Sequence, residues 1–193
     1  ANIKLMLAMV GGDPTRLRPH VKTHKTPQII TMQVREGITQ FKASTLAEAE
    51  LCAANGATDV LIAYPLQGPA ISELIRLRQV FKTTTFSMLV DCAESLPQIQ
   101  TALEGSDQTL DVFLDIDCGM QRTGISPDEQ ALKLYEELHG MHWINVRGLH
   151  AYDGHLHDSD PEQRALQCET AFSPVIELRK KLEASGLRVR TLV

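Results

Sequence analysis

The chain has 193 residues, of which 43% are apolar, and its 24 acidic against 19 basic residues give a net charge of −5. The apolar share is sufficient for a hydrophobic core and excludes intrinsic disorder, and the length predicts one domain, or at most one large and one small. The mild acidity without a basic block argues against a nucleic-acid binder, and no apolar run approaches the roughly 20 residues of a membrane helix.

The cysteines lie far apart in the sequence and form no CxxC pair: Cys52, Cys92, Cys118 and Cys168. This spacing predicts neither a zinc ribbon nor a dense disulfide framework. Because the first residues do not resemble a secretion signal either, we expect a reducing, cytoplasmic setting.

Short apolar runs alternate with amphipathic stretches along the chain. The runs predict strands at Leu17–Thr23, Thr39–Ala43, Asp59–Tyr64, Thr85–Asp91, Leu110–Asp117, Asn145–Ala151 and Arg188–Val193. Helix start signals lie between them, at Thr26-Pro27, Thr45 with Glu48, Ser126 with Glu129, and Asp160-Pro161. Pro174 interrupts the last helical stretch, which is expected either to kink there or to consist of two helices.

Repeated alternation of strand and helix predicts a parallel sheet covered by helices, either an open doubly wound sheet or a (β/α) barrel. An open sheet that binds a dinucleotide has a glycine-rich turn after its first strand. Here the first predicted strand continues into His20–Lys25, which contains no glycine, so the pattern favours the barrel. In both folds the catalytic residues lie at the carboxyl ends of the strands.

The first predicted strand ends in a basic cluster, His20-Val21-Lys22-Thr23-His24-Lys25. Because side chains alternate along a strand, we expect His20, Lys22 and His24 on one face, which points inward in a barrel. Desolvation and neighbouring positive charge would lower the pKa of such a lysine and make it a usable amine nucleophile. The alternative is a solvated strand end at the protein surface.

The fifth predicted strand ends in Asp115 and Asp117, which share one face, and a loop with Gly119, Arg122 and Gly124 follows. The two carboxylates either form an ion pair with Arg122 or bind a metal. In either case Arg122 is well placed to contact a ligand.

The sixth predicted strand leads into a segment that contains His150, Tyr152, Asp153, His155, His157 and Asp158. Imidazole and carboxylate groups are good metal ligands, although this spacing is not a specific metal-binding signature. One interpretation is therefore a metal-dependent barrel hydrolase built on Asp115, Asp117, His150 and His155.

Taken together, these strand ends resemble the D-threonine aldolase and D-serine dehydratase family of pyridoxal-phosphate enzymes, which shares the barrel fold of alanine racemase. The segments that carry the resemblance are Leu17–Lys25, similar to the family's lysine motif, Asp117–Gly124, similar to its glycine–methionine–x–arginine–threonine–glycine segment, and Gly148–Tyr152, similar to its sixth strand. The resemblance implies that residues 1–193 form a (β/α)8 TIM-type barrel domain of the alanine racemase type. It would be truncated after about seven strands and would lack the family's C-terminal β domain.

The resemblance also implies roles for individual residues. Lys22 would bond covalently to pyridoxal phosphate, with His20 under or beside the cofactor and Arg122 on the side of its phenolic oxygen. Tyr152 would lie against the cofactor ring or near the substrate. The run after Tyr152 departs from the aldolase pattern, and its histidines, His155 and His157, are the candidates for the base that acts on the substrate hydroxyl.

The implied function is that of a pyridoxal-phosphate-dependent lyase acting on D-β-hydroxy amino acids. It would cleave them to glycine and an aldehyde, like D-threonine aldolase, or eliminate to a keto acid and ammonia, like D-serine dehydratase. A protein that holds pyridoxal phosphate without turnover is a further alternative. The family also implies a divalent metal, Mn or Zn, held by residues outside this chain, and a homodimer of the full-length protein.

The chain begins at Ala1 without a methionine and ends at Val193 inside a predicted strand. We therefore expect a piece of a longer protein that has lost its eighth strand. Since barrels commonly bind phosphate in the loops after strands seven and eight, this piece alone is expected to bind the cofactor weakly.

Overall fold

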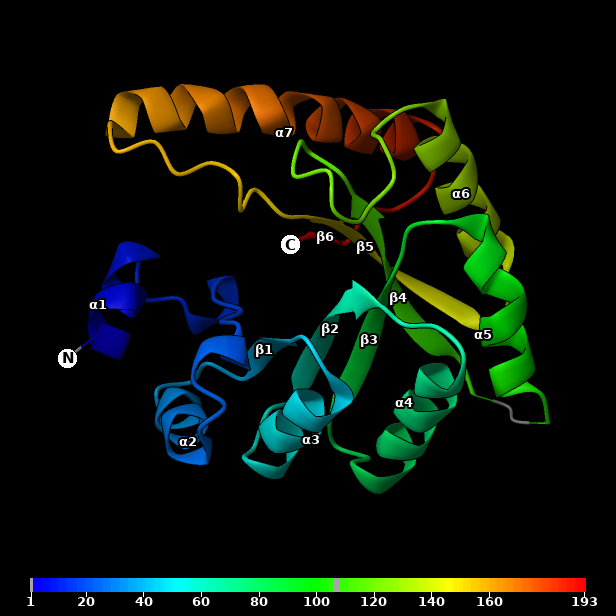
Figure 1. The fold of residues 1–193 in the computed structure, drawn as a ribbon, viewed down its shortest axis with the longest axis horizontal. Coiled ribbons are helices and arrows are strands. Elements are labelled where there is room, and N and C mark those ends of the chain that lie inside the picture. The colour runs from blue at the N-terminus through cyan, green and yellow to red at the C-terminus, as the bar shows by residue number, and fades with distance from the viewer. Residues whose placement is uncertain (1, 106–107) are drawn as a thin grey trace. The chain divides into compact units, whose positions relative to one another are not determined.

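A computed structural model of the protein describes residues 2–105 and 108–193 (Figure 1). Contacts between Cα atoms divide the chain into two compact units, Ala1–Met88 and Leu89–Val193. The strands of the described residues form a sheet in which neighbours follow chain order, β1-β2-β3-β4-β5-β6. The pairs β1–β2, β4–β5 and β5–β6 are parallel, as the alternation of strand and helix predicts.

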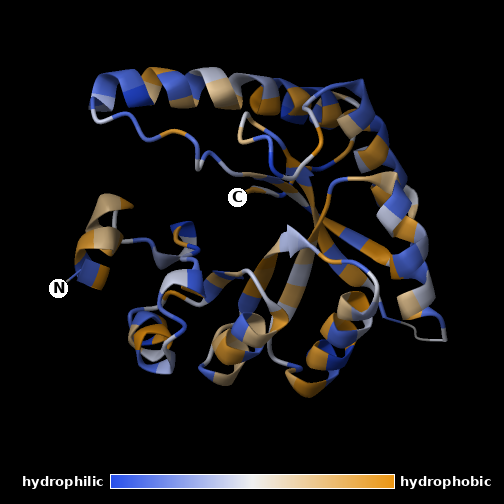
Figure 2. Cartoon of the chain, viewed as in Figure 1, coloured by the Kyte–Doolittle hydropathy of each residue, from blue (hydrophilic) through white to orange (hydrophobic). Residues whose placement is uncertain are grey.

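The first unit contains α1 (Asn2–Met9), η1 (Pro14–Arg16), η2 (Val21–Thr23), α2 (Pro27–Arg35), β1 (Gln40–Ala43), α3 (Leu46–Ala54), β2 (Asp59–Pro65), α4 (Pro69–Val80) and most of β3 (Thr85–Val90). Phe41 in β1 lies opposite Val60 in β2, and both are fully buried. Figure 2 shows hydrophobic residues along these strands, whereas the helices mix hydrophobic and hydrophilic residues. Helices α2, α3 and α4 therefore bury one side each and leave the other side to water, whereas α1 has no buried residue.

The second unit contains η3 (Ala93–Ser95), α5 (Leu96–Leu103), β4 (Leu110–Ile116), α6 (Glu129–Gly140), β5 (Ile144–Ala151), α7 (Pro161–Ala184) and β6 (Thr191–Leu192). Strand β4 is buried along its whole length, as expected of a parallel strand covered on both faces. Within the described part of the chain, no helix is both long enough and apolar enough to cross a membrane.

The predicted strands from Thr39 onward are confirmed, with small differences at their ends, and the last is the shortest, at Thr191–Leu192. The strand predicted at Leu17–Thr23 is wrong. Only His20 in this segment pairs with a strand, through an isolated bridge to Lys42, and η2 follows at once. The His20 side chain accepts a hydrogen bond from the backbone N–H of Lys22, and this local bond competes with continued strand pairing.

The helix start signals are confirmed at three places and wrong at one. Helix α2 begins at Pro27, directly after its N-cap residue Thr26. Thr45 Oγ1 accepts the backbone N–H of Glu48 at 3.2 Å, and Asp160 caps α7 in the same way. The start predicted at Ser126 is wrong, because the carboxylate of Asp128 accepts the first backbone N–H groups of α6. Of the two alternatives at Pro174, the division into two helices is wrong, since α7 continues through this residue as a single helix.

Candidate functional site

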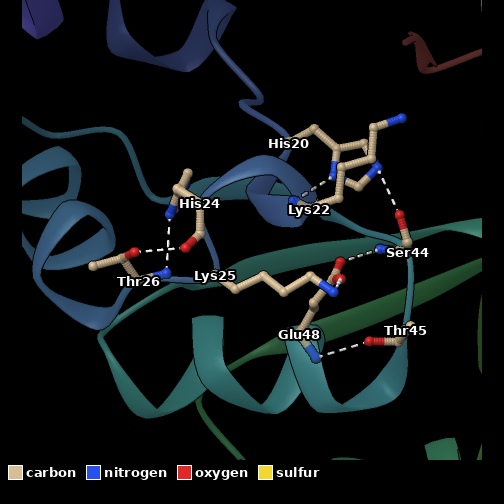
Figure 3. Close-up of polar contacts among 8 residues, drawn as sticks. All are labelled: His20, Lys22, His24, Lys25, Thr26, Ser44, Thr45 and Glu48. Atoms are coloured by element: carbon tan, nitrogen blue, oxygen red, sulfur yellow. Dashed lines mark hydrogen bonds and ion pairs between the residues drawn. The ribbon is translucent and has the colours of Figure 1, made fainter.

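Lys22 lies in the middle of η2 and is exposed, whereas its neighbour Val21 is fully buried. His20 Nδ1 accepts the backbone N–H of Lys22 at 3.2 Å and thereby caps the turn (Figure 3). The predicted shared strand face of His20, Lys22 and His24 does not exist, because Val21–Thr23 form a helical turn rather than a strand. Lys22 is instead a water-accessible amine on a turn that is anchored by a buried valine and a capping imidazole.

A buried carboxylate lies beneath the same turn. The Glu48 side chain is only 4% exposed, and its Oε2 accepts the backbone N–H of Ser44 at 2.7 Å. Lys25 Nζ lies 3.1 Å from Glu48 Oε1 (Figure 3). Burial by itself would raise the pKa of Glu48, but the hydrogen bond from the Ser44 backbone N–H and the hydrogen bond and positive charge of Lys25 together lower that pKa below its ordinary value. Glu48 is therefore held in its ionised form.

The loop of residues 117–124 follows β4 in the second unit and is anchored at both ends. Asp117 Oδ1 accepts the backbone N–H groups of Gly119, at 2.9 Å, and Gln121, at 3.0 Å. Asp91, directly after β3, accepts the backbone N–H of Gly124 at 3.1 Å.

Arg122 extends from this loop over the ring of Tyr152, which follows β5. The guanidinium carbon lies 5.1 Å from the ring centre, within the range of a cation–π contact. Tyr152 is 36% exposed and Arg122 is exposed as well. The two residues line a small pocket together with Asp115, Ile116, Asp117, Met120 and Thr123. The structure thus brings together Arg122, which its place in the loop marked as a ligand contact, and Tyr152, for which the family resemblance implies one.

Asp115 and His150 form a buried pair at the ends of β4 and β5. His150 Nδ1 lies 2.6 Å from Asp115 Oδ1, and the two residues are register partners in the parallel ladder. The second oxygen of Asp115, Oδ2, is buried and has no hydrogen-bond partner within the described residues. Asp115 therefore pairs with His150 and not with Arg122, and it differs in role from Asp117, which holds the loop.

The two remaining histidines have different surroundings. His155 packs against the loop of residues 117–124, since its Nε2 lies 2.8 Å from where a Cβ on Gly119 would stand. Its Nδ1 is buried without a hydrogen-bond partner in the described part of the chain, whereas His157 is exposed.

Across residues 2–105 and 108–193, no three His, Cys, Asp or Glu side chains group as a metal site requires. The hydrolase interpretation depended on such a site, formed by Asp115, Asp117, His150 and His155. These side chains instead serve the buried pair, the loop and the packing of His155, so that interpretation is wrong.

A family model described as the N-terminal domain of alanine racemase matches residues 1–192. A D-threonine aldolase from Arthrobacter sp. is 31% identical over 193 residues, which cover 100% of this chain and 50% of that protein. The crystal structure of D-threonine aldolase from Filomicrobium marinum matches with a TM-score of 0.90 at 27% identity. The match covers 99% of this chain and 52% of the aldolase chain. The structure of D-threo-3-hydroxyaspartate dehydratase from Delftia sp. HT23 matches with a TM-score of 0.86 at 25% identity. The match covers 98% of this chain and 50% of the dehydratase chain. The chain thus spans about half the length of these proteins.

Proposed function

Because the chain belongs to the alanine racemase N-terminal domain family, we propose that its protein is a pyridoxal-phosphate-dependent lyase of D-β-hydroxy amino acids. Similarity along the whole chain to D-threonine aldolases and to a D-threo-3-hydroxyaspartate dehydratase supports this substrate class. These names share an amino acid that carries a hydroxyl group on its β-carbon. The parallel α/β fold, with its polar side chains at the carboxyl ends of strands, agrees with the expected barrel type.

The chemistry of the available side chains fits pyridoxal phosphate, an anionic aromatic aldehyde. In the first unit, Lys22 offers an exposed primary amine on a turn whose backbone is fixed by Val21 and His20. In the second unit, Arg122 offers a guanidinium and Tyr152 an exposed aromatic ring. An amine that bonds covalently to the aldehyde, a cation for a phenolic oxygen and a ring for stacking are three of the partners that this cofactor requires besides those for its phosphate. When bound, the cofactor supplies the electron sink for the reaction.

We assign the following roles to the chain's own residues. Lys22 holds the cofactor covalently, and His20 keeps the Lys22 turn in place. Arg122 provides positive charge toward the cofactor or the substrate, and Tyr152 provides a ring contact or a polar partner.

For the proton on the substrate hydroxyl we favour His155 over His157. His155 lies against the loop that carries Arg122, and its Nδ1 is a buried nitrogen for which the described residues offer no partner. His157 is exposed and has no such link to the loop. A base that accepts the hydroxyl proton allows the bond between Cα and Cβ to break, so that the aldehyde leaves, and Cα then takes up a proton to give glycine.

The proposed reaction is D-threonine aldolase-like cleavage, with D-serine dehydratase-like elimination as the second candidate because of the similarity to the Delftia dehydratase. The bond that breaks is decided by how the substrate is oriented, which a few side chains control. The full-length protein is further proposed to need Mn or Zn bound by residues outside this chain, and to act as a homodimer.

The observation that carries the proposal is that Lys22 is exposed and lies on a turn whose backbone is anchored. The full-length gene product is incubated with pyridoxal phosphate, reduced with borohydride, digested and mapped, and we expect the label on Lys22. Lys22→Ala should abolish labelling and turnover, whereas Lys82→Ala, at another exposed lysine, should change neither. A label on a different residue would refute the assignment.

A second assay separates the reactions. With D-threonine or D-serine and added Mn or Zn, release of glycine and aldehyde identifies an aldolase, and release of keto acid and ammonia identifies a dehydratase. Labelling of Lys22 without either product identifies a protein that holds the cofactor without turnover, and contradicts the proposed lyase activity.

A further inference from the structure

A continuous series of hydrogen bonds connects the buried Glu48 carboxylate to the Lys22 turn (Figure 3). Glu48 Oε2 accepts the backbone N–H of Ser44 at 2.7 Å. The Ser44 hydroxyl lies 3.2 Å from His20 Nε2, and His20 Nδ1 accepts the backbone N–H of Lys22 at 3.2 Å. Ser44 directly follows β1, so the series links the end of a buried strand to the turn that carries the amine.

The positions of the protons on His20 follow from the backbone N–H donor at the Lys22 end of the series. His20 Nδ1 faces a backbone N–H and therefore has to accept. A neutral imidazole that accepts at Nδ1 carries its proton on Nε2, and this N–H then donates to the Ser44 oxygen. The backbone N–H of Lys22 thus selects the histidine tautomer, and the Ser44 hydroxyl stabilises it by accepting the Nε2–H and fixing the ring orientation.

Lys25 keeps the far end of the series charged. Its backbone has φ of 45°, a left-handed conformation that is unfavourable for residues other than glycine. Its amine nevertheless reaches the buried Glu48 carboxylate, although the Lys25 side chain is itself 60% exposed. A glycine at this position would relieve the backbone but would leave the buried carboxylate without its cation. The side chain at position 25 therefore has a role that outweighs the local strain.

Capping of α3 does not account for these contacts. Thr45 Oγ1 already accepts the backbone N–H of Glu48, which is the bond that starts the helix. In a simple capping box the glutamate would bond back to the backbone N–H of Thr45. Glu48 instead bonds to Ser44, one residue earlier, and so fixes the residue whose hydroxyl contacts His20.

We propose that Glu48 and Ser44 are positioning residues for Lys22, which they hold in place through the tautomer and orientation of His20. This inference rests on the proposed function of Lys22 as the cofactor-binding lysine. Neither residue is assigned a contact with the cofactor or the substrate. Without them the His20 ring loses its fixed orientation, the turn has a less reliable cap, and the amine spends less time in the position from which it reacts.

The first test measures how fast Lys22 becomes attached to added pyridoxal phosphate in the full-length gene product, by borohydride trapping at timed intervals and peptide mapping. We expect Ser44→Ala and Glu48→Gln to slow attachment about tenfold, the effect of losing one strong polar interaction. Ser44→Thr keeps the hydroxyl and should keep the wild-type rate. Asp111→Asn is the matched control, because Asp111, at the start of β4, is also a buried carboxylate in an ion pair, with Arg147 in β5. This substitution should leave the rate within about twofold.

The second test reads the tautomer of His20 by nitrogen NMR in protein free of pyridoxal phosphate. The wild type should show the proton on Nε2, and Ser44→Ala and Glu48→Gln should shift His20 toward a mixture of tautomers, whereas Asp111→Asn should not. Ser44→Ala keeps the backbone bond to Glu48, so it remains informative even where Glu48→Gln does not fold. A label on another lysine in the wild type refutes the proposed function, while the NMR comparison still tests the network. A label on Lys22 at equal rates in wild type, Ser44→Ala and Glu48→Gln overturns the inference and leaves the function intact.

Discussion

Substitution of Gly124 by alanine is expected to unfold the loop that carries Arg122. Gly124 has φ of +100°, and an added Cβ would lie 2.6 Å from the backbone nitrogen of Asp117 and 2.7 Å from the carbonyl carbon of Ile116. Because both neighbours are backbone atoms, no change of side-chain rotamer relieves the overlap. The backbone has to move, and the bonds next to it, Asp117 N to Ile125 O and Ile125 N to Asp115 O, are lost with that movement.

The free-energy cost of Gly124→Ala combines two contributions. A left-handed backbone at a residue other than glycine costs about 1–3 kcal/mol. Each of the two backbone hydrogen bonds contributes about 1 kcal/mol, so the free energy of unfolding should fall by about 3–5 kcal/mol. This is a large share of the roughly 5–15 kcal/mol that stabilises a typical domain.

Substitutions at two other glycines distinguish the cost of the steric overlap from the cost of the left-handed backbone. Gly186 has φ of +80° but nothing within 4 Å of an added Cβ, so Gly186→Ala should cost only about 1 kcal/mol. Gly140 ends α6, also with nothing within 4 Å, and Gly140→Ala should stabilise by up to about 1 kcal/mol. Urea unfolding of each full-length variant, followed by circular dichroism, measures all three. If Gly124→Ala destabilises no more than Gly186→Ala, the close approach of the loop to β4 is wrong.

Three further predictions concern buried groups. The pKa of Glu48 is lowered on folding, so the ionised carboxylate stabilises the fold fully above pH 4.5, and this contribution is lost as the pH falls through the lower folded pKa. The free energies of unfolding of wild type and Glu48→Gln should therefore converge on acidification. A constant difference between them down to about pH 3 would contradict this. Asp115→Ala leaves His150 buried without its 2.6 Å partner and should cost about 3 kcal/mol in urea unfolding, so a loss below about 1 kcal/mol would show that the pair contributes little. Burial raises the pKa of the Cys52 thiol to about 12, so an aromatic disulfide reagent should modify it only upon unfolding; rapid modification in the native protein would disprove its burial.

The strands of the sheet could be predicted from the sequence because short runs of neighbouring residues indicate them. A run such as Val60-Leu61-Ile62 is buried on both faces of a parallel strand, and its continuous apolar character shows this directly. The Lys22 segment could not be predicted in the same way. Alternation of side chains suggested a strand, but the imidazole of His20 competes for the backbone N–H that a strand would use. A histidine two residues before a lysine does not distinguish these outcomes in sequence.

The pair of Asp115 and His150 was missed for a different reason. Each residue was marked as a candidate, but their contact depends on the register between β4 and β5, which places Asp115 opposite His150. That register includes a shift between Val112 and Phe113, so even a correct prediction of both strands would have aligned the wrong residues. The contact of Arg122 with Tyr152 likewise depends on the anchored loop rather than on either residue's position in the sequence.

The Lys22 turn and the Arg122 loop use carboxylates for the same physical purpose. Glu48 accepts a backbone N–H from Ser44 next to the Lys22 turn, and Asp117 and Asp91 accept backbone N–H groups within the Arg122 loop. An ionised carboxylate forms a stronger hydrogen bond to a backbone N–H than a neutral acceptor does, and it fixes the segment without occupying the ligand's position. The acidic residues near a candidate site therefore need not be acids, bases or metal ligands. In this chain their measurable effect is on where two cationic side chains are held, so substituting them should change the placement of Lys22 and Arg122 before it changes any proton transfer.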